Sequence, residues 1–308
     1  MLISRALAPR ELQPAALTIG NFDGVHRGHQ AMLSRVKDVA RTRDLRAAVL
    51  TFEPHPRELF APDSAPTRLT SLREKLELLA EHGVAHTHVQ RFNRAFAAMS
   101  AEDFVARILV EGFHVRWVLV GSDFRYGARR TGDLERLRAA GKQYGFEVET
   151  MPTVEMEGTR VSSSAVRAAL AEGDLQTAQR LLGRTYSISG RVVRGLQLGR
   201  KLGFPTANVQ MKHNRPPLMG IYAVRLHGLR SEPLNGVASI GLRPTVDSSG
   251  KTTLEVHVFD FAEEIYGRHV RVEFLAKIRD EEKYADLDLL KAQIARDCEA
   301  AISILESL

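Results

Sequence analysis

The sequence contains very little cysteine. Cys298 is the single cysteine among 308 residues, so the chain can form no internal disulfide and no cysteine-based zinc cluster. This usage suits a reducing compartment. No apolar run approaches the length of a bilayer-spanning helix, and residues 1–20 lack the charged start, apolar core and cleavage site of a secretory signal. We therefore expect a cytoplasmic protein with no membrane partner.

The sequence also lacks any cluster of charge of one sign and any low-complexity tract. Lysine and arginine number 43 against 37 acidic residues, and the formal net charge is +6. A basic chain can bind nucleic acid or small polyanions such as nucleotides. No nucleic-acid-binding motif is present, so we expect small-molecule substrates and no nucleic acid. The composition does not indicate an oligomeric state.

The chain is long enough for two domains. In its first half, apolar runs typical of strands alternate with apolar residues at helical spacing. Runs typical of buried strands occupy 15–19, 47–52, 86–92, 117–120 and 146–151. Helical spacing occupies 30–41, 72–81, 100–110, 134–144, 163–171 and 174–182. This alternation predicts an α/β domain with a parallel sheet and right-handed crossovers.

From Tyr186 the pattern changes to short β-rich runs separated by glycine and proline. These runs cover 186–193, 206–211, 221–226, 236–240, 253–259 and 269–275, and a helical pattern covers 287–305. Such spacing predicts an antiparallel barrel or sandwich that ends in a helix. We place the two domains at 1–184 and 185–308.

The stretch from Gly20 to His29 is a glycine-rich turn with two histidines between a predicted strand and a predicted helix. Backbone N–H groups and the positive end of a helix dipole bind phosphate at such a turn. On spacing alone, His26 and His29 could instead be a structural pair or two metal ligands. A metal site would need a third ligand, and the sequence identifies none.

A second glycine-rich segment, 195–208, is basic. It is not a Walker A loop, because three residues separate Gly195 from Gly199 and neither Ser nor Thr follows Lys201. By composition alone it is a turn with solvated charges.

Glu255 lies in a predicted strand whose apolar and polar residues alternate, and this pattern alone puts its side chain on the solvated face.

The whole string from Gly20 to His29 resembles the H-x-G-H signature of the nucleotidyltransferase superfamily. It is similar to the FMN adenylyltransferase module of bacterial bifunctional riboflavin kinase/FAD synthetases, and 51–56, 120–127 and 161–167 match that module in order. The resemblance implies a Rossmann-like domain in which the FMN phosphate attacks the α-phosphorus of ATP and pyrophosphate leaves. The attacking phosphate is already an anion, so the step needs no general base.

The same resemblance assigns roles to single residues. His26 and His29 would face the ATP phosphates and stabilise their charge. The other implied ATP-binding residues are Gly20, Asn21, Phe22, Gly24, Ser163, Ser164 and Arg167; the implied flavin-binding residues are His55, Arg57, Asp123 and Arg125. Without the resemblance, Ser163 would be a helix cap and Arg167 a solvated charge. The family commonly has threonine in place of Ser164, but a hydroxyl remains.

The segment 195–208, centred on Pro205-Thr206-Ala207-Asn208, resembles the riboflavin kinase signature. The stretches 220–223, 235–245, 254–257 and 279–284 match the same family in order. By this resemblance Glu255 is the catalytic base, and Gly195, Gly199, Gly203 and Thr206 bind ATP. Thr206 and Asn208 would hold Mg²⁺ with the ATP phosphates, because this hard cation prefers oxygen ligands.

The sequence therefore predicts a bifunctional enzyme. The C-terminal domain would phosphorylate riboflavin to FMN, and the N-terminal domain would adenylylate FMN to FAD. ATP, riboflavin and FMN are the expected substrates, with Mg²⁺ as cofactor. One alternative is that only one activity is retained and the other domain is regulatory. Another is a different acceptor, such as pantetheine phosphate or nicotinamide mononucleotide, which the kinase-like second half argues against.

Overall fold

The computed structural model describes residues 1–308 except 7–12, 196–198, 200–201, 213–214 and 243–251. Its contacts divide the chain into two compact units, Met1–Pro66 with Leu72–Ser162 and Thr67–Ser71 with Ser163–Leu308. The sequence-based domain boundary after residue 184 stays a prediction. Among the described residues, no helix combines the length and the apolar character needed to cross a membrane.

The first unit is built on a parallel sheet with the strand order β1-β4-β3-β2-β5-β6. Its strands are β1 Leu2–Ser4, β2 Ala15–Ile19, β3 Arg46–Glu53, β4 His86–Arg91, β5 Val115–Gly121 and β6 Glu147–Met151. The predicted parallel sheet is confirmed. Because β3 and β5 lie on opposite sides of β2, the strand order reverses beside β2. Ligands of open α/β sheets bind outside the carboxyl ends of the strands at such a point.

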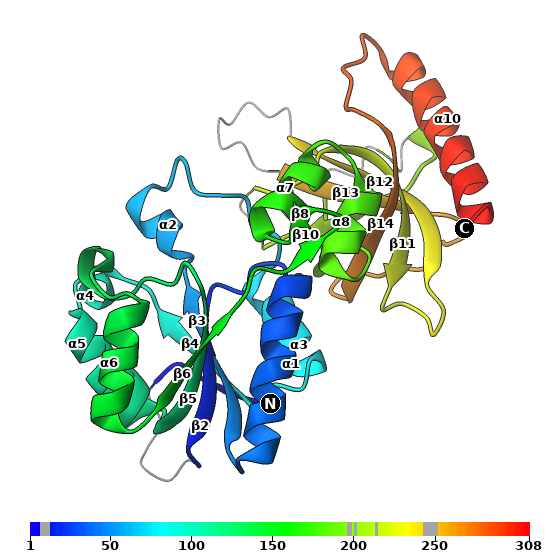
Figure 1. The fold of residues 1–308 in the computed structure, drawn as a ribbon. Helices are drawn as coiled ribbons and strands as arrows, with labels where there is room; N and C mark the ends of the chain where they lie inside the picture. Colours follow the sequence, from blue (N-terminus) through cyan, green and yellow to red (C-terminus); the bar gives the residue numbers. More distant parts are fainter. Residues whose placement is uncertain (7–12, 196–198, 200–201, 213–214, 243–251) are drawn as a thin grey trace. The chain divides into compact units, whose positions relative to one another are not determined.

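Helices cover both faces of this sheet (Figure 1). On one face lie α1 Arg27–Thr42 and α3 Leu72–Glu81, whose buried Val36 and Leu79 pack against sheet residues. On the other face lie a π-helix, Phe104–Gly112, and α6 Leu134–Tyr144. The shorter elements are α2 Pro56–Phe60, α4 Arg94–Ala97, α5 Ala101–Asp103, a 3₁₀ turn at Ala128–Arg130, β7 Glu155–Met156 and β8 Thr159–Arg160.

One predicted helix has a different form. The pattern over 100–110 predicts an α-helix, but the structure has the short α5 followed by the π-helix. The backbone N–H of Phe113 donates to the carbonyl of Ile108, five residues back, at 3.1 Å. Apolar periodicity over so short a segment does not distinguish the two helix types, because their turns differ by less than one residue.

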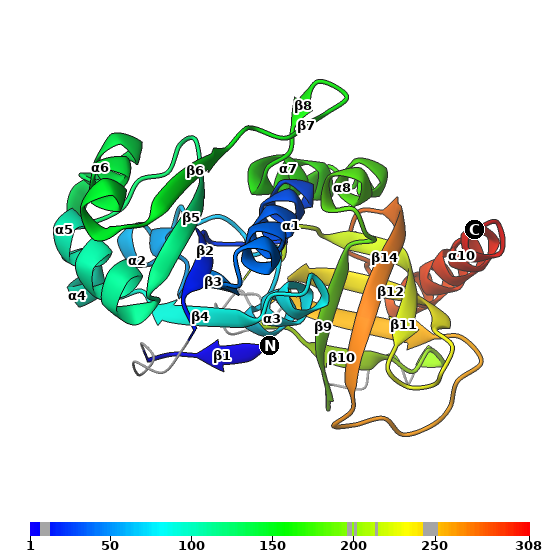
Figure 2. The same ribbon diagram turned by 60° about the horizontal axis from the view of Figure 1, so that its bottom comes forward.

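The second unit contains a closed antiparallel barrel with the strand order β10-β13-β12-β11-β14-β9 (Figure 2). Its strands are β9 Ser187–Val193, β10 Ala207–Gln210, β11 Gly220–His227, β12 Leu234–Leu242, β13 Thr252–Val258 and β14 His269–Arg279. Helix α10, Leu287–Glu306, packs its Cys298 and Ala301 against β11 and β12. The predicted barrel with a terminal helix is confirmed. Helices α7 Ser163–Ala171 and α8 Leu175–Leu182 also belong to this unit.

Candidate active sites

The turn between β2 and α1 stacks two histidine rings. The centroids of the His26 and His29 rings are 3.7 Å apart, and their planes differ by 17°. His26 caps α1, because its Nδ1 accepts the backbone N–H of His29 at 3.3 Å. A neutral His26 therefore carries its proton on Nε2, where the ring can donate a hydrogen bond to an anion.

The backbone of the turn holds these rings in place. Gly24 has φ +81°, and Phe22 and Val25 also have positive φ angles. A Cβ atom at Gly28 would lie 3.2 Å from the His26 ring. The Phe22 ring is fully buried, with its centroid 4.9 Å from that of His29. Glycine at position 28 is thus what allows the His26 ring to lie against the start of α1.

His29 is neutral in this environment. Burial, the nearby His26 and the positive charge of Lys75, in that order, hold the pKa of His29 well below its usual value. Its Nδ1 atom is shielded from solvent and has no hydrogen-bond partner. Binding of a polyphosphate would oppose these effects, because an adjacent anion favours the protonated imidazole.

The loop after β3 is tied to the same turn. Thr51 on β3 donates its hydroxyl to the carbonyl of Asn21 at 3.1 Å. His55 is buried and caps α2: its Nδ1 accepts the N–H of Arg57 at 3.2 Å, and its own N–H is donated to Glu58 at 3.1 Å. The neutral His55 ring also keeps its proton on Nε2. The Arg57 side chain is exposed.

The loop after β5 carries the other two predicted flavin-side residues. Asp123 forms an ion pair with Arg160 and Arg125 forms one with Asp133, both at 3.3 Å and largely exposed. Since β5 and β3 both border β2, the fold brings these loops and the histidine turn to one edge of the sheet. That edge is the predicted ligand edge.

A row of aromatic rings at this edge was not found from the sequence. Neighbouring ring centroids lie 5.3–6.3 Å apart through Phe60, Phe92, Phe52, Phe96, Phe104, Tyr126 and Phe124. Phe60 at its end is 68% exposed. The signal available in the sequence is that Phe52 and Phe92 lie at the ends of two predicted strands. Phe104 and Tyr126 in this row are buried in the core, and Phe52, Phe96 and Phe124 pack against it, so the exposed apolar surface is at the Phe60 end.

The predicted triphosphate residues of α7 lie in the second unit. Arg167 donates its Nε to the carbonyl of Thr67 at 2.6 Å, and Ser163 begins the helix. The histidine turn belongs to the first unit, so a common site of Ser163, Ser164 and Arg167 with the histidines stays a prediction.

The barrel brings together the three predicted kinase residues. Thr206 donates its hydroxyl to Glu255 Oε2 at 3.2 Å. Asn208 on β10 lies directly opposite Glu255 on β13. Asn208 is only 9% exposed, and its buried Oδ1 atom has no hydrogen-bond partner. A hydroxyl, an amide oxygen and a carboxylate therefore meet on neighbouring strands.

Glycines permit close approach around these residues. A Cβ atom at Gly195 would lie 2.5 Å from the side-chain amide of Asn208, and one at Gly199 would overlap the carbonyl oxygen of Phe204. Gly203 has φ +91°. The intervening residues 196–198 and 200–201 lie outside the described residues.

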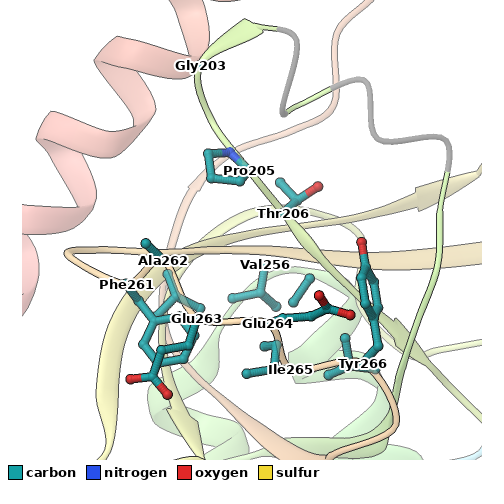
Figure 3. Close-up of a pocket in the computed structure, with 13 residues that line it drawn as sticks. Gly203, Pro205, Thr206, Val256, Phe261, Ala262, Glu263, Glu264, Ile265 and Tyr266 are labelled. Carbon is teal, nitrogen blue, oxygen red and sulfur yellow. The ribbon is translucent and has the colours of Figure 1, made fainter.

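A pocket of about 410 Å³ lies beside Thr206. Figure 3 shows Pro205 and Thr206 on one side and the segment from Phe261 to Tyr266 on the other, with Val256 between them. The guanidinium of Arg194 lies 5.3 Å from the centroid of the Tyr266 ring. The lining is mixed: Val192, Val256 and Ile265 are apolar, whereas Glu263 and Glu264 contribute carboxylates. The Thr206 hydroxyl at its edge is the one bonded to Glu255.

No group of three or more His, Cys, Asp or Glu side chains suited to a metal ion occurs in the described part of the chain. The oxygens of Thr206 and Asn208 are a different kind of donor set. Hydroxyl and amide oxygens suit Mg²⁺ when substrate phosphates and water complete its coordination. The buried, unpartnered Oδ1 of Asn208 fits such a ligand.

The α/β unit has a glycine-rich, phosphate-binding type of turn at the end of a parallel strand, and the barrel has a site formed by side-chain oxygens. These two sites are typical of transferases that act on phosphate groups. Comparison with known proteins specifies the family. The FAD synthetase family model matches residues 8–165, and the riboflavin kinase model matches residues 182–305. The chain belongs to the family of bifunctional riboflavin kinase/FMN adenylyltransferases.

Individual relatives agree with this membership. The bifunctional riboflavin kinase/FMN adenylyltransferase of Escherichia coli (strain K12) is 52% identical, over 94% of this chain and 92% of its own length. That of Haemophilus influenzae is 45% identical over 97% of both chains. A solved structure titled as a macrolide-efflux protein from Streptococcus pneumoniae matches with a TM-score of 0.80 and 28% identity, over 96% of this chain and 97% of its own.

Proposed function

We propose that this chain makes FAD from riboflavin in two ATP-dependent steps, with the barrel forming FMN and the α/β unit converting FMN to FAD. Family membership in both halves supports the two activities. The observation that carries the residue roles is the pairing of Thr206 with Glu255 beside Asn208. The scarcity of cysteine supports a cytoplasmic location.

In the barrel, Glu255 is the general base. The terminal hydroxyl of riboflavin is a neutral, weak nucleophile, so a carboxylate that accepts its proton assists attack on the γ-phosphorus of ATP. A new O–P bond forms, the bond to the β-phosphate oxygen breaks, and ADP leaves. The hydrogen bond from Thr206 orients the Glu255 carboxylate. Thr206 and Asn208 would hold Mg²⁺, which when bound neutralises charge on the phosphates.

The pocket beside Thr206 is the proposed place for the adenine of ATP. Its volume of about 410 Å³, its apolar side chains and its carboxylates, which can accept from an exocyclic amine, suit a flat base. The Tyr266 ring on its wall offers a stacking surface. Gly203 and Thr206 line the pocket, and Gly199 lies beside Thr206, so a base held there leaves its phosphates near Gly199 and Asn208.

In the α/β unit, the reaction needs charge stabilisation. The FMN phosphate attacks the α-phosphorus, a P–O bond forms, and pyrophosphate leaves with the electrons of the broken bond. His26 donates from Nε2 to a phosphate oxygen, and the N–H groups at the start of α1 add further donors. His29 gains a proton more easily as negative charge accumulates beside it.

The aromatic row is the proposed support for the flavin ring of FMN. Stacking on aromatic rings and burial of an apolar face suit the isoalloxazine. His55, Arg57, Asp123 and Arg125 lie on loops at the same edge of the sheet and would contact its polar groups. Ser163, Ser164 and Arg167 are proposed to bind the triphosphate of ATP.

A chromatographic assay tests this function. Purified protein is incubated with riboflavin, ATP and Mg²⁺, and the flavins are separated. We expect FMN to appear first and FAD to follow. Formation of FMN alone would support the alternative in which the first domain is regulatory. If added FMN were adenylylated but riboflavin were not phosphorylated, the barrel would be the regulatory part. Absence of both products would refute the proposal.

A further inference from the structure

The segment after β14 brings a second carboxylate, that of Glu281, against β12, the strand paired with the one that contains Glu255. Ser239 on β12 donates its hydroxyl to Glu281 Oε1 at 3.4 Å. A Cβ atom at Gly241, two residues further along β12, would overlap the Glu281 carboxylate. Glycine inside a strand often marks a site where another group approaches closely, and here that group is Glu281.

Ser239 lies directly opposite Glu255 in the pairing of β12 with β13. Asn208 lies opposite Glu255 on its other side. Directly paired residues share one face of a sheet, so these three side chains form a row across adjacent strands. With strands about 4.8 Å apart, the row is roughly 10 Å long. Glu281 lies at its end, on the side of Glu255 away from Asn208.

The segment that carries Glu281 is anchored at its start. Arg279 donates two hydrogen bonds to the buried Asp297 of α10, at 2.8 and 2.7 Å, and a third to the carbonyl of Asp280 at 2.9 Å. Gln293 donates to the same Asp297 carboxylate at 2.9 Å. A bidentate pair of this kind fixes geometry, so the backbone leaving β14 is directed toward β12.

The proposed phosphorylation of riboflavin in the barrel indicates what the Glu281 carboxylate could bind. The attacking hydroxyl must lie at Glu255 and in line with the departing ADP. The nucleotide is proposed to lie on the Thr206 and Asn208 side. The rest of the acceptor then extends to the opposite side of Glu255, over Ser239 and Glu281. The groups of riboflavin nearest its reacting hydroxyl are the other hydroxyls of the ribityl chain.

We propose that Glu281 is a flavin-binding residue whose carboxylate accepts hydrogen bonds from the internal ribityl hydroxyls, and that Ser239 holds it in place. An ionised carboxylate has only acceptors and can bind two neighbouring hydroxyls at once. The residue therefore selects an acceptor with a polyol chain. This inference rests on the proposed kinase function of the barrel.

The first test compares full-length Glu281→Ala and Glu281→Gln with Glu282→Gln. Glu282 is the adjacent carboxylate, and it accepts a hydrogen bond from Tyr284 at 2.9 Å, so it is a matched control. We expect the KM for riboflavin to rise about 10- to 100-fold in Glu281→Ala and less in Glu281→Gln, because a hydrogen bond to a charged group is lost. The KM for ATP should not change, and Glu282→Gln should match the wild type.

The second test measures flavin binding and not the rate of riboflavin phosphorylation. Quenching of flavin fluorescence is measured with riboflavin and with lumiflavin, which has a methyl group in place of the ribityl chain. Glu281→Ala should weaken the binding of riboflavin and leave that of lumiflavin unchanged. Equal weakening of both ligands, or unchanged riboflavin affinity and KM, would overturn the proposal.

The two hypotheses fail in different ways. Conversion of added FMN to FAD, measured on the same preparation, reports whether each variant is folded in its first unit. If wild-type protein forms no FMN from riboflavin, the kinase function itself is wrong. If the wild type forms FMN and Glu281→Ala forms it with an unchanged KM for riboflavin, only the role of Glu281 is wrong.

Discussion

At the scale of single residues, the stacked pair His26 and His29 carries the first testable consequence. We expect His29→Ala to lower FAD formation from FMN about 100- to 1,000-fold, the usual cost of removing a charge-stabilising donor. Phosphorylation of riboflavin by the barrel should continue. The two rates are measured separately, each with its own flavin supplied. Normal FAD synthesis in this variant would show that the histidine assignment is wrong.

Glu255→Gln is expected to give the reverse result. Glutamine keeps the shape and can still accept from Thr206, but it cannot take the proton of the attacking hydroxyl. FMN formation should fall about 100- to 10,000-fold, the range typical of general-base catalysis. Conversion of added FMN to FAD should be unchanged. Retention of kinase activity would exclude Glu255 as the base.

The sequence assigns roles to residues of this kind when a motif contains them, and these roles stay predictions. His26, His29, Thr206 and Glu255 all lie in short strings that resemble family signatures. It does not predict partners that meet only through folding. Ser239 and Glu281 are separated by 42 positions, and their contact depends on how Arg279 directs the chain after β14. The row of phenylalanines is likewise made by strand order.

At the scale of loops and helices, two glycines make a matched pair. In Gly28→Ala the new Cβ would lie 3.2 Å from the His26 ring, and in Gly195→Ala it would lie 2.5 Å from the Asn208 amide. We expect the first variant to lower FAD formation and keep FMN formation, and the second to lower FMN formation and keep FAD formation. Each variant is therefore the control for the other. A loss of both activities in either variant, with an unfolded circular dichroism spectrum, would indicate a structural effect only.

Elements with strong local signals were predicted almost residue by residue. Helix α6, for example, occupies 134–144 as its apolar spacing indicates, and Asp133 caps it by accepting the N–H of Arg136. The sequence does not predict helix α2, because Pro54 and Pro56 are residues that usually interrupt a helix. Pro56 is instead the first helical residue, a position where its fixed φ is favourable, and His55 supplies the cap.

At the scale of the whole molecule, buried histidines make stability depend on pH. His86 is 2% exposed, and burial, then the charges of Arg46 and His88, lower its pKa to about 4. Burial also lowers the pKa of His88. A buried neutral histidine must stay deprotonated in the folded state while the unfolded chain binds the proton. Stability should therefore be complete above pH of about 6.5 and fall progressively toward pH of about 4.

This pH dependence is measurable in the first unit alone. Trp117 is the single tryptophan, and it is buried in β5 of the sheet that contains His86. Urea unfolding followed by its fluorescence should show a loss of about 2 to 3 kcal/mol between pH 7 and pH 4 from His86. His86→Gln should reduce this loss. An equal loss in the variant and the wild type would contradict the assignment.

Strand β1 covers one side of β4 and is itself the edge strand of the first sheet. It has only three residues, and it covers the side of β4 that would otherwise be an open edge. Ser4 of β1 also bonds the rings of His86 and His88, at 2.8 and 2.9 Å. Detachment of so short a strand would expose unpaired backbone groups of β4 to another chain. The described barrel has no such edge, because its sheet is closed, so partly unfolded molecules should associate through the first sheet, at the open edge β6 and at β4 once β1 detaches.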